Sequence, residues 1–248
     1  MNKVLLVTGG SRGIGAATAC LAATDGYDVC ISYRQNRTAA DSVVHSIEQQ
    51  GRRAIAVAAD MASEADILQL FDEVDRQLGP LTALVNNAGI LEPQMCVADM
   101  TFARLNRVFS TNVIGSFLCA REAVKRMSTL QGGSGGAIVN ISSGAATSGS
   151  PGEYVDYAAS KGAIDTMTIG LAKEVAKEGI RVNVVRPGFI YTDIHASGGE
   201  PNRVDRVKAL VPLQRGGQPE EVAQAVLWLL SDKSSFTIGT FINVTGGV

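Results

Sequence analysis

Short runs of β-branched and apolar residues alternate with longer segments of helical apolar spacing along the whole 248-residue chain. This alternation predicts a parallel sheet, because parallel strands need crossover connections and a crossover is usually a helix. Helices then cover both faces. We therefore expect an α/β fold with a doubly wound, seven-stranded parallel sheet, its strands near residues 4–8, 28–33, 53–58, 83–86, 137–141, 181–186 and 240–244.

Neither an internal repeat nor a linker divides the chain, so a single domain over residues 1–248 is expected. A hydrophobic content of 46% is enough for one large core at this length. The segment 191–217 is long and polar for a connection, and such segments often form lids over a substrate. The helical periodicity falls at 15–24, 38–50, 64–78, 102–127, 157–177 and 219–230.

Charge and cysteine usage exclude several partners. The formal charge of -2 and the mixed placement of charges give no basic stripe for a nucleic acid and no polybasic segment for a membrane. No apolar run approaches the roughly 20 residues of a membrane helix. We expect a cytoplasmic protein with a small-molecule partner and no metal site, since four cysteines without metal-ligand spacing are expected to be buried free thiols: Cys20, Cys30, Cys96 and Cys119.

A glycine-rich turn, Thr8-Gly9-Gly10-Ser11-Arg12-Gly13-Ile14-Gly15, joins the first predicted strand to the first predicted helix. Glycines let the backbone approach a ligand, and the amino end of the helix offers unpaired N–H groups to a phosphate. The same glycines would also serve a helix-entry turn with positive φ. A strand, turn and helix in this order favour dinucleotide binding by Gly9, Ser11, Arg12, Gly13, Ile14 and Gly15.

The same turn matches a second motif. Gly9-x-Ser11-x-Gly13 has the pattern of the nucleophile elbow of α/β-hydrolases, with Ser11 as the nucleophile. An elbow here would precede most of the sheet that must support it. Only His45 and His195 are available as a base. A serine hydrolase therefore ranks below a dinucleotide-binding protein.

The second predicted strand ends in Ser32-Tyr33-Arg34-Gln35-Asn36-Arg37, about 20 residues after the turn, where an acid would bind an adenosine ribose diol. No acid stands there. Arg34 and Arg12, with Asn36 or Arg37 as further candidates, would instead flank a 2′-phosphate through charge-assisted hydrogen bonds. The expected cofactor is therefore NADP(H) rather than NAD(H).

Tyr157 and Lys161 are four residues apart in a predicted helix and so share one face. An ammonium about 4 Å from a phenol is worth about 4 kcal/mol at an effective dielectric of about 20. That is enough to bring the tyrosine pKa from about 10 toward neutrality, where the phenol can act as a general acid or base. A tyrosine and a lysine at this spacing are more often an ordinary pair on a helix surface. The function of Tyr157 and Lys161 therefore has to be inferred from the rest of the chain.

Four motifs occur in order: the glycine turn, Asn86-Asn87-Ala88-Gly89, Ile141-Ser142-Ser143 and Tyr157-x-x-x-Lys161. With them the chain resembles the short-chain dehydrogenase/reductase family over essentially its whole length. It is similar to the NADP-using carbonyl reductases that include 3-oxoacyl carrier-protein reductases and glucose dehydrogenases. The resemblance implies a Rossmann fold and an NADP(H)-dependent oxidoreductase that interconverts a carbonyl and an alcohol by direct hydride transfer.

The resemblance implies a catalytic tetrad of Asn112, Ser143, Tyr157 and Lys161. Tyr157 would donate a proton in reduction and accept one in oxidation, while Lys161 would lower its pKa and bind the nicotinamide ribose. Ser143 would hold the substrate oxygen, and Asn112 would support a water that leads to the lysine. Ser142 stays an alternative to Ser143, because the interval from the serine pair to the tyrosine is one residue longer than is usual in the family.

The family pattern also implies cofactor contacts after other strands. Asp60 and Met61 would meet the adenine, although Asp60 suits a helix start equally well. As an alternative, Asn86 and Asn87 would do no more than form a turn. His195 is expected to be a solvated loop residue, and Glu153 and Tyr154 are candidates for the substrate pocket. The remaining expected contacts are Asn87, Ala88 and Gly89 near the ribose, and Pro187, Gly188, Ile190 and Thr192 near the nicotinamide amide.

Family members commonly form tetramers through faces equivalent to those of 102–127, 157–177 and the apolar end at 241–248, so a homotetramer is expected. The alternative function is an NADPH-binding sensor without catalysis, against which the intact tetrad argues. Neither the substrate nor the direction of the reaction follows from the sequence, although a preference for NADP(H) favours reduction.

Overall fold

The structure, a computed structural model, describes residues 3–248 and contains one seven-stranded sheet. Every strand pair is parallel, in the order β3-β2-β1-β4-β5-β6-β7. The strand order reverses between β1 and β4, which opens a crevice at the carboxyl ends of these strands. The strands are β1 (Lys3–Val7), β2 (Tyr27–Tyr33), β3 (Ala54–Ala58), β4 (Ala83–Asn86), β5 (Gly136–Ile141), β6 (Ile180–Pro187) and β7 (Phe241–Val244).

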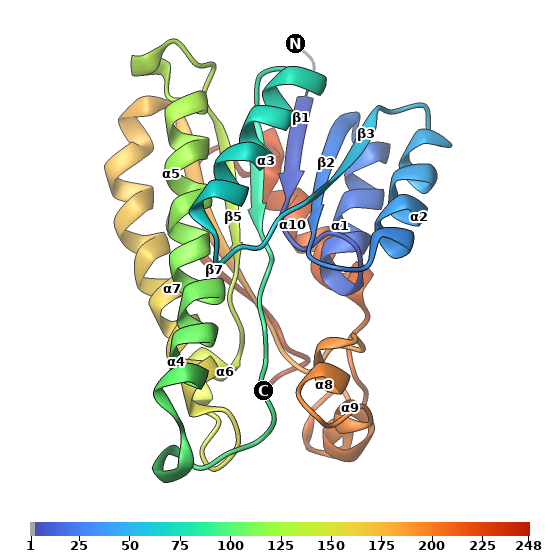
Figure 1. The fold of residues 1–248 in the computed structure, drawn as a ribbon, viewed down its shortest axis with the longest axis vertical. Helices are drawn as coiled ribbons and strands as arrows, with labels where there is room; N and C mark the ends of the chain where they lie inside the picture. The colour runs from blue at the N-terminus through green and yellow to red at the C-terminus, as the bar shows by residue number, and fades with distance from the viewer. Residues whose placement is uncertain (1–2) are drawn as a thin grey trace.

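Helices cover both faces of the sheet (Figure 1), as the alternating pattern predicted. One face carries α1 (Gly13–Thr24), α2 (Arg37–Glu48) and α10 (Pro219–Leu230), and the other carries α3 (Glu64–Gln77), α5 (Gly115–Met127) and α7 (Val155–Val175). The remaining helices are α4 (Phe102–Phe109), α6 (Ala145–Ser148), α8 (Ile194–Ser197) and α9 (Arg203–Val207), with short 3-10 turns at Val97–Asp99, Thr129–Gln131, Ala176–Glu178, Lys208–Leu210 and Asp232–Ser234.

The strand β1 shows why the sheet lies between two layers of helices. Val4 and Leu6 face the layer of α3 and α5, whereas Leu5 and Val7 face the layer of α1 and α10. All four side chains are fully buried. A strand buried on both faces requires a nearly continuous apolar run, which is the pattern from which the parallel sheet was predicted. The predicted α/β fold is confirmed.

The predicted helix 102–127 is not continuous. A π-helical turn, η2 (Ser110–Ile114), separates α4 from α5. The periodicity of the apolar residues gave no sign of it, because one extra residue in a turn leaves both flanking helices amphipathic. Such π-turns are frequent at functional sites, and Asn112 lies in the middle of this one.

The segment 191–217 contains α8, α9 and a 3-10 turn, and it lies beyond the carboxyl ends of the strands (Figure 1). In the described part of the chain, residues 3–248, no helix has the length and apolar character needed to cross a membrane.

The four cysteines are free, but one expectation about them is wrong. Cys30 and Cys119 are buried and Cys20 is partly buried, whereas Cys96 is exposed. Cys96 directly precedes the short turn Val97–Asp99 in a surface connection, where apolar neighbours in the sequence do not form a core.

Candidate active site

A cavity of about 1220 Å³ runs along the carboxyl ends of the strands, from the end of β2 to the segment that carries α8 and α9. Two residues of the predicted catalytic and cofactor-binding set, Gly15 and Asn112, are absent from its wall. The predicted residues that line it are Gly9, Ser11, Arg12, Gly13, Ile14, Arg34, Asp60, Met61, Asn87, Ala88, Gly89, Ser143, Tyr157, Lys161, Pro187, Gly188, Ile190 and Thr192.

The glycine turn has the geometry of an anion-binding loop. Gly9 and Gly13 have φ values of 62° and 54°, in the left-handed region that other residues rarely adopt. The helix α1 begins after Arg12 without a side-chain cap, which leaves its first N–H groups available to a ligand, and Gly13 and Ile14 line the cavity. The turn therefore fits the pyrophosphate of a dinucleotide. Gly15 instead serves packing, since a Cβ there would lie 2.5 Å from Asn87 Nδ2.

Asn87 and Thr8 hold the turn against the end of β4. Asn87 Nδ2 donates to the carbonyl oxygens of Thr8 and Gly9, at 2.9 and 3.0 Å. Thr8 Oγ1 accepts from the backbone N–H groups of Asn87 and Ala88, both at 3.0 Å. Asn87 therefore builds the turn through its side chain while it lines the cavity. Asn86 is buried and donates to Asn140 Oδ1 at 2.9 Å, which gives it a structural role.

Two arginines predicted to bind the 2′-phosphate, Arg34 and Arg12, line the cavity. Arg34 Nε lies 3.1 Å from Asp60 Oδ2, and the arginine side chain is 63% exposed. Arg12 donates from Nη2 to Ser197 Oγ on α8 at 3.3 Å. Arg37 points away to Asp41 on its own helix, at 3.4 Å, and does not line the cavity. Of the arginines predicted for the 2′-phosphate, Arg12 and Arg34 therefore line the cavity and Arg37 does not.

Asn36 also lines the cavity, and its side chain caps α2 by accepting from Ala39 N at 3.0 Å. A side chain that is already the helix cap has less freedom to turn toward a phosphate.

Tyr157 and Lys161 lie in the first two turns of α7 and point into the cavity. Lys161 Nζ lies 5.7 Å from the centre of the Tyr157 ring and donates to Ile141 O at 2.8 Å. Burial raises the pKa of Tyr157 to about 12, which a hydrogen bond with Ser143 opposes only in part. Burial also lowers the pKa of Lys161 to about 8, against the attraction of Asp165.

These directions correct the expectation that Lys161 brings the tyrosine pKa toward neutrality. The expected value of about 4 kcal/mol assumed an ammonium about 4 Å away, whereas the structure turns Nζ toward a carbonyl. Desolvation disfavours the charged form of each group and dominates here. Tyr157 is therefore a neutral phenol at physiological pH.

The serine pair is divided between two tasks. Ser142 is buried, and its Oγ donates to the carbonyl oxygen of Lys161 at 3.1 Å. Ser143 Oγ accepts from Ala145 N at 3.1 Å, and Ser143 lies close enough to Tyr157 to lower the pKa of its phenol. The structure thus brings Ser143, and not Ser142, to the tyrosine hydroxyl.

Asn112 is fully buried behind the cavity wall. Its Oδ1 accepts from Ile90 N at 2.8 Å, and its Nδ2 donates to Ile90 O and to Ser160 Oγ, both at 3.1 Å. The side chain therefore clamps the connection after β4 onto α7 at Ser160, the residue directly before Lys161. Its predicted support of a water stays a prediction.

A buried ion pair fixes the start of α7. Arg104 Nε lies 2.7 Å from Asp156 Oδ2, with side chains 4% and 1% exposed. Asp156 Oδ1 also accepts from Tyr157 N at 2.9 Å, and Arg104 donates to Pro93 O at 2.6 Å. The pair positions the backbone of Tyr157. It was missed in the sequence, because 52 residues separate the partners and neither stands in a motif.

His195 is buried rather than solvated, which corrects the expectation for it. Its Nε2 lies 3.0 Å from Ile190 O, so it carries the hydrogen. Thr192 Oγ1 donates to the same carbonyl at 3.4 Å. Burial lowers the pKa of His195. The two bonds hold Ile190, at the predicted nicotinamide end of the cavity, in a fixed orientation.

Of the two candidates for the substrate pocket, Tyr154 lines the cavity and Glu153 does not. Phe189 and Arg203, which were not predicted, line it as well. An arginine in a polar segment looks like a solvated charge in the sequence. Nothing in its local pattern distinguishes Arg203 from Arg206 or Lys208.

Known proteins resemble this chain over its full length. A family model described as enoyl-(acyl carrier protein) reductase matches residues 9–248. The uncharacterized oxidoreductase YgfF of Escherichia coli is 62% identical over 244 residues, 98% of this chain and 99% of the relative. The 3-oxoacyl-[acyl-carrier-protein] reductase FabG of Staphylococcus epidermidis is 35% identical over 248 residues, 100% of this chain and 99% of the relative.

A solved structure shows the same architecture. The crystal structure of a short chain dehydrogenase from Burkholderia cenocepacia, in complex with NADP, matches with a TM-score of 0.91 and 35% identity, over 99% of this chain and 97% of that one. Fold, site geometry and relatives agree. The chain belongs to the short-chain dehydrogenase/reductase family of oxidoreductases.

Proposed function

We propose that the protein is an NADP(H)-dependent oxidoreductase that interconverts a carbonyl and an alcohol by direct hydride transfer, with Tyr157 as general acid/base. The observation that carries the proposal is the cavity itself, which joins a phosphate-binding turn to Ser143, Tyr157 and Lys161. The relatives are oxidoreductases, and a structural neighbour was solved with NADP. We further propose that residues 1–248 act as one dinucleotide-binding and catalytic domain.

The cofactor would lie along the carboxyl ends of the strands. The glycine turn and the start of α1 would hold its pyrophosphate, with Arg12 and Arg34 on the 2′-phosphate. When bound, NADPH would supply the hydride. The nicotinamide would lie at the end formed by Pro187, Gly188, Ile190 and Thr192, the ribose near Asn87, Ala88 and Gly89, and the adenine near Asp60 and Met61.

The chemistry of reduction needs a proton donor and a donor for developing negative charge on the substrate oxygen. Ser143 and Tyr157 lie close together and both line the cavity, so one oxygen atom can meet both hydroxyls. The raised pKa of Tyr157 keeps its proton in place until an alkoxide forms. Lys161, whose pKa is lowered to about 8, stays mostly charged below that pH and stabilises the resulting tyrosinate. The arrangement favours reduction.

A serine variant tests this assignment. Ser143→Ala removes a hydroxyl that stabilises the developing charge, so kcat/KM for carbonyl reduction is expected to fall about a hundredfold. Ser142→Ala is the matched variant, because that hydroxyl bonds to the Lys161 carbonyl. It is expected to lower the free energy of unfolding by about 1 kcal/mol and kcat/KM by less than about tenfold. The reverse order of the two activity losses would assign the substrate contact to Ser142.

A variant of Arg34 tests the proposed preference for NADPH over NADH. Removing a charge-assisted bond to the 2′-phosphate in Arg34→Gln is expected to raise the Kd of NADPH about tenfold to thirtyfold. The Kd of NADH, which lacks that phosphate, should change less than about threefold. Both constants can be measured by nicotinamide fluorescence.

Arg37→Gln is the matched control, because Arg37 carries the same charge three residues later and pairs with Asp41 outside the cavity. Its effect on NADPH binding should stay below about twofold. Equal losses of NADPH and NADH affinity in Arg34→Gln would contradict the proposed 2′-phosphate site.

The proposed activity is tested by a screen of sugars, ketoesters, quinones and 3-oxoacyl thioesters, with NADPH and NADH in parallel and nicotinamide absorbance as the readout. The proposal expects turnover of at least one carbonyl class with NADPH. NADPH binding without turnover of any of them would support a sensor instead.

The hydrolase alternative has no support in the geometry of the histidines. His45 Nε2 contacts Gln49 on α2 at 2.8 Å, and His195 Nε2 contacts Ile190 O. Within residues 3–248, no hydrogen bond joins either ring to Ser11. This geometry gives the hydrolase alternative no support and favours the oxidoreductase.

Homotetramer assembly remains a proposal. Large apolar side chains stand exposed on the layer of α4 and α5, with Phe102 at 83% and Phe117 at 51%, and Trp228 on α10 is 41% exposed. Such patches suit contacts between copies of the chain. The free thiols Cys30 and Cys119 support a reducing compartment, and we propose the cytoplasm.

A further inference from the structure

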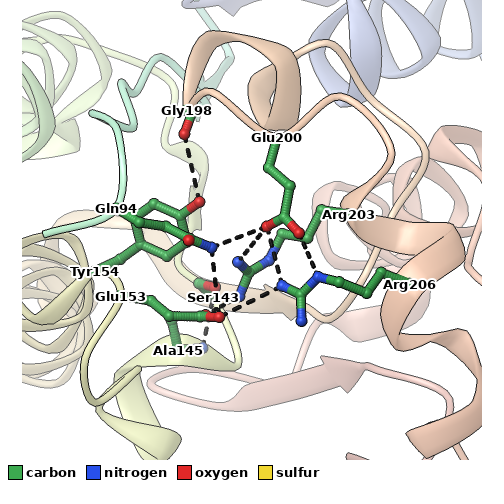
Figure 2. A network of polar contacts seen from close by, with 9 residues as sticks. All are labelled: Gln94, Ser143, Ala145, Glu153, Tyr154, Gly198, Glu200, Arg203 and Arg206. Carbon is green, nitrogen blue, oxygen red and sulfur yellow. Dashed lines mark hydrogen bonds and ion pairs between the residues drawn. The ribbon is translucent and has the colours of Figure 1, made fainter.

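Four charged side chains join the segment of α8 and α9 to the connection between β5 and α7 (Figure 2). Glu153 lies in that connection, whereas Glu200, Arg203 and Arg206 lie in or before α9. We call these four residues the lid clasp.

In the lid clasp, each of the two arginines contacts both glutamates. Arg203 donates to Glu153 and, at 3.1 Å, to Glu200. Arg206 donates to Glu200 at 3.0 Å and lies 3.4 Å from Glu153. Gln94, from the connection after β4, donates to Glu200 at 2.9 Å and to Glu153 at 3.4 Å (Figure 2). Three connections that lie far apart in the sequence are thus fastened at one point.

Arg203 is the buried centre of the clasp, with a side chain 9% exposed. Its guanidinium carbon lies 4.7 Å from the centre of the Tyr154 ring and 5.7 Å from that of Phe189. A desolvated, paired guanidinium between two rings holds its place more firmly than an exposed ion pair does. The Tyr154 hydroxyl adds a bond of 3.5 Å to Gly198 O, next to α8.

The same arginine is part of the cavity wall. Arg203, Tyr154 and Phe189 line the cavity that also contains Tyr157 and Ser143. The position of α9 therefore sets how much space lies beyond the reacting hydroxyls. If the clasp opens, a wall of the substrate end moves with it.

The clasp also balances the charge of Arg203, its member in the cavity wall, because two carboxylates pair with the two guanidinium groups. An incoming anion would find no free cation at Arg203. It would have to displace a carboxylate that is already paired, which costs free energy. A compact, uncharged group meets no such obstacle among Tyr154, Phe189 and Leu91.

Resting on the proposed function, we propose that the lid clasp holds residues 191–217 closed and makes the site select compact, uncharged carbonyl compounds over bulky, anionic acyl thioesters. Arg203 and Glu153 are then specificity-determining residues. The named activity of the FabG relative concerns an acyl group on a carrier protein, so the proposal separates this chain from that relative by substrate class.

Two probes with one reacting group test the selection. Ethyl acetoacetate and acetoacetyl-coenzyme A carry the same 3-oxobutanoyl unit, and only the second has a bulky, charged tether. The wild-type protein is expected to show a kcat/KM at least about tenfold higher for the ester. In Glu153→Gln, which keeps the side-chain size but removes a charge from the clasp, the ratio should fall about fivefold to tenfold.

Amide hydrogen exchange of the purified protein measures the closure without any reaction. Glu153→Gln and Arg206→Met should each speed exchange in residues 194–207 about fivefold or more. Lys208→Met is the matched control, since it removes a lid cation that pairs with Asp205, at 2.8 Å, and not with a residue of the clasp. Its exchange and its substrate ratio should equal those of the wild type. Arg206 is half exposed, so its variant is expected to fold.

The outcomes separate this proposal from the proposed function. Faster exchange together with a lower ratio in the clasp variants supports it. Unchanged exchange, an unchanged ratio, a wild-type preference for acetoacetyl-coenzyme A, or no turnover of either probe overturns it. NADPH-dependent turnover of any other carbonyl in those cases would leave the proposed function standing, whereas its absence across the whole screen would remove both.

Discussion

Replacing Tyr157 by phenylalanine is expected to lower kcat for carbonyl reduction about a thousandfold and to leave the Kd of NADPH within about twofold. The reacting proton is lost, while the ring, which lines the cavity, stays. Because burial raises the pKa of Tyr157 to about 12, the wild-type phenol is fully protonated at pH 7 and the variant removes an occupied donor. Steady-state kinetics and fluorescence titration measure the two quantities.

Tyr27→Phe provides the matched control. Tyr27 is also buried, but it stands at the start of β2, outside the cavity wall. Its kcat should remain within about twofold of the wild-type value. Near-normal turnover by Tyr157→Phe would contradict the assignment of the proton donor, and a parallel loss of NADPH binding would show that the ring has a different task.

Replacing Lys161 by methionine is expected to lower kcat/KM about a thousandfold, because the only side-chain cation beside the tyrosinate within the described residues disappears. The protein should nevertheless remain folded and stable. Burial lowers the pKa of Lys161 from its ordinary 10.5 to about 8, so keeping the ammonium charged in the fold costs about 3 kcal/mol at pH 7. The variant also loses the hydrogen bond from Lys161 Nζ to Ile141 O. This loss offsets about 1 to 3 kcal/mol of the stability gained by removing the buried charge.

At pH 7 we therefore expect the free energy of unfolding of Lys161→Met to exceed that of the wild type by about 1 kcal/mol. Between pH 8 and 10.5 the unfolded lysine holds a proton that the folded one has lost, so wild-type stability rises with pH. The advantage of the variant should therefore shrink from pH 7 to pH 10. Urea unfolding followed by fluorescence at both values measures it. An advantage that grows with pH would contradict the depressed pKa.

Much of the site could be predicted because its parts stand in local motifs. Gly9 and Gly13 are needed wherever a strand turns directly into a helix above a phosphate, and Tyr157 and Lys161 share a helix face at any tertiary placement. The parallel sheet follows from the alternation of short buried runs with amphipathic segments. Such features depend on neighbours within about five residues, which a sequence contains.

What the sequence could not supply depends on burial and on distant partners. The pKa of Tyr157 was expected to fall, and the structure raises it, because the burial of the phenol outweighs the opposing effect of Ser143. His195 was expected in solvent and lies against Ile190 O. Arg203 becomes part of the cavity wall through Glu153, 50 residues away. None of these placements leaves a periodicity or a spacing in the chain.

The central claim is direct hydride transfer from NADPH to a carbonyl carbon in this cavity. It is tested most directly with NADPH that carries two deuterium atoms at C4 of the nicotinamide, incubated with the carbonyl compounds of the screen. Mass spectrometry of the product alcohol should show one deuterium, on the carbinol carbon, with the wild-type protein and none above background with Tyr157→Phe. An alcohol formed without deuterium, or deuterated NADPH left unconsumed with every carbonyl class, would contradict the account.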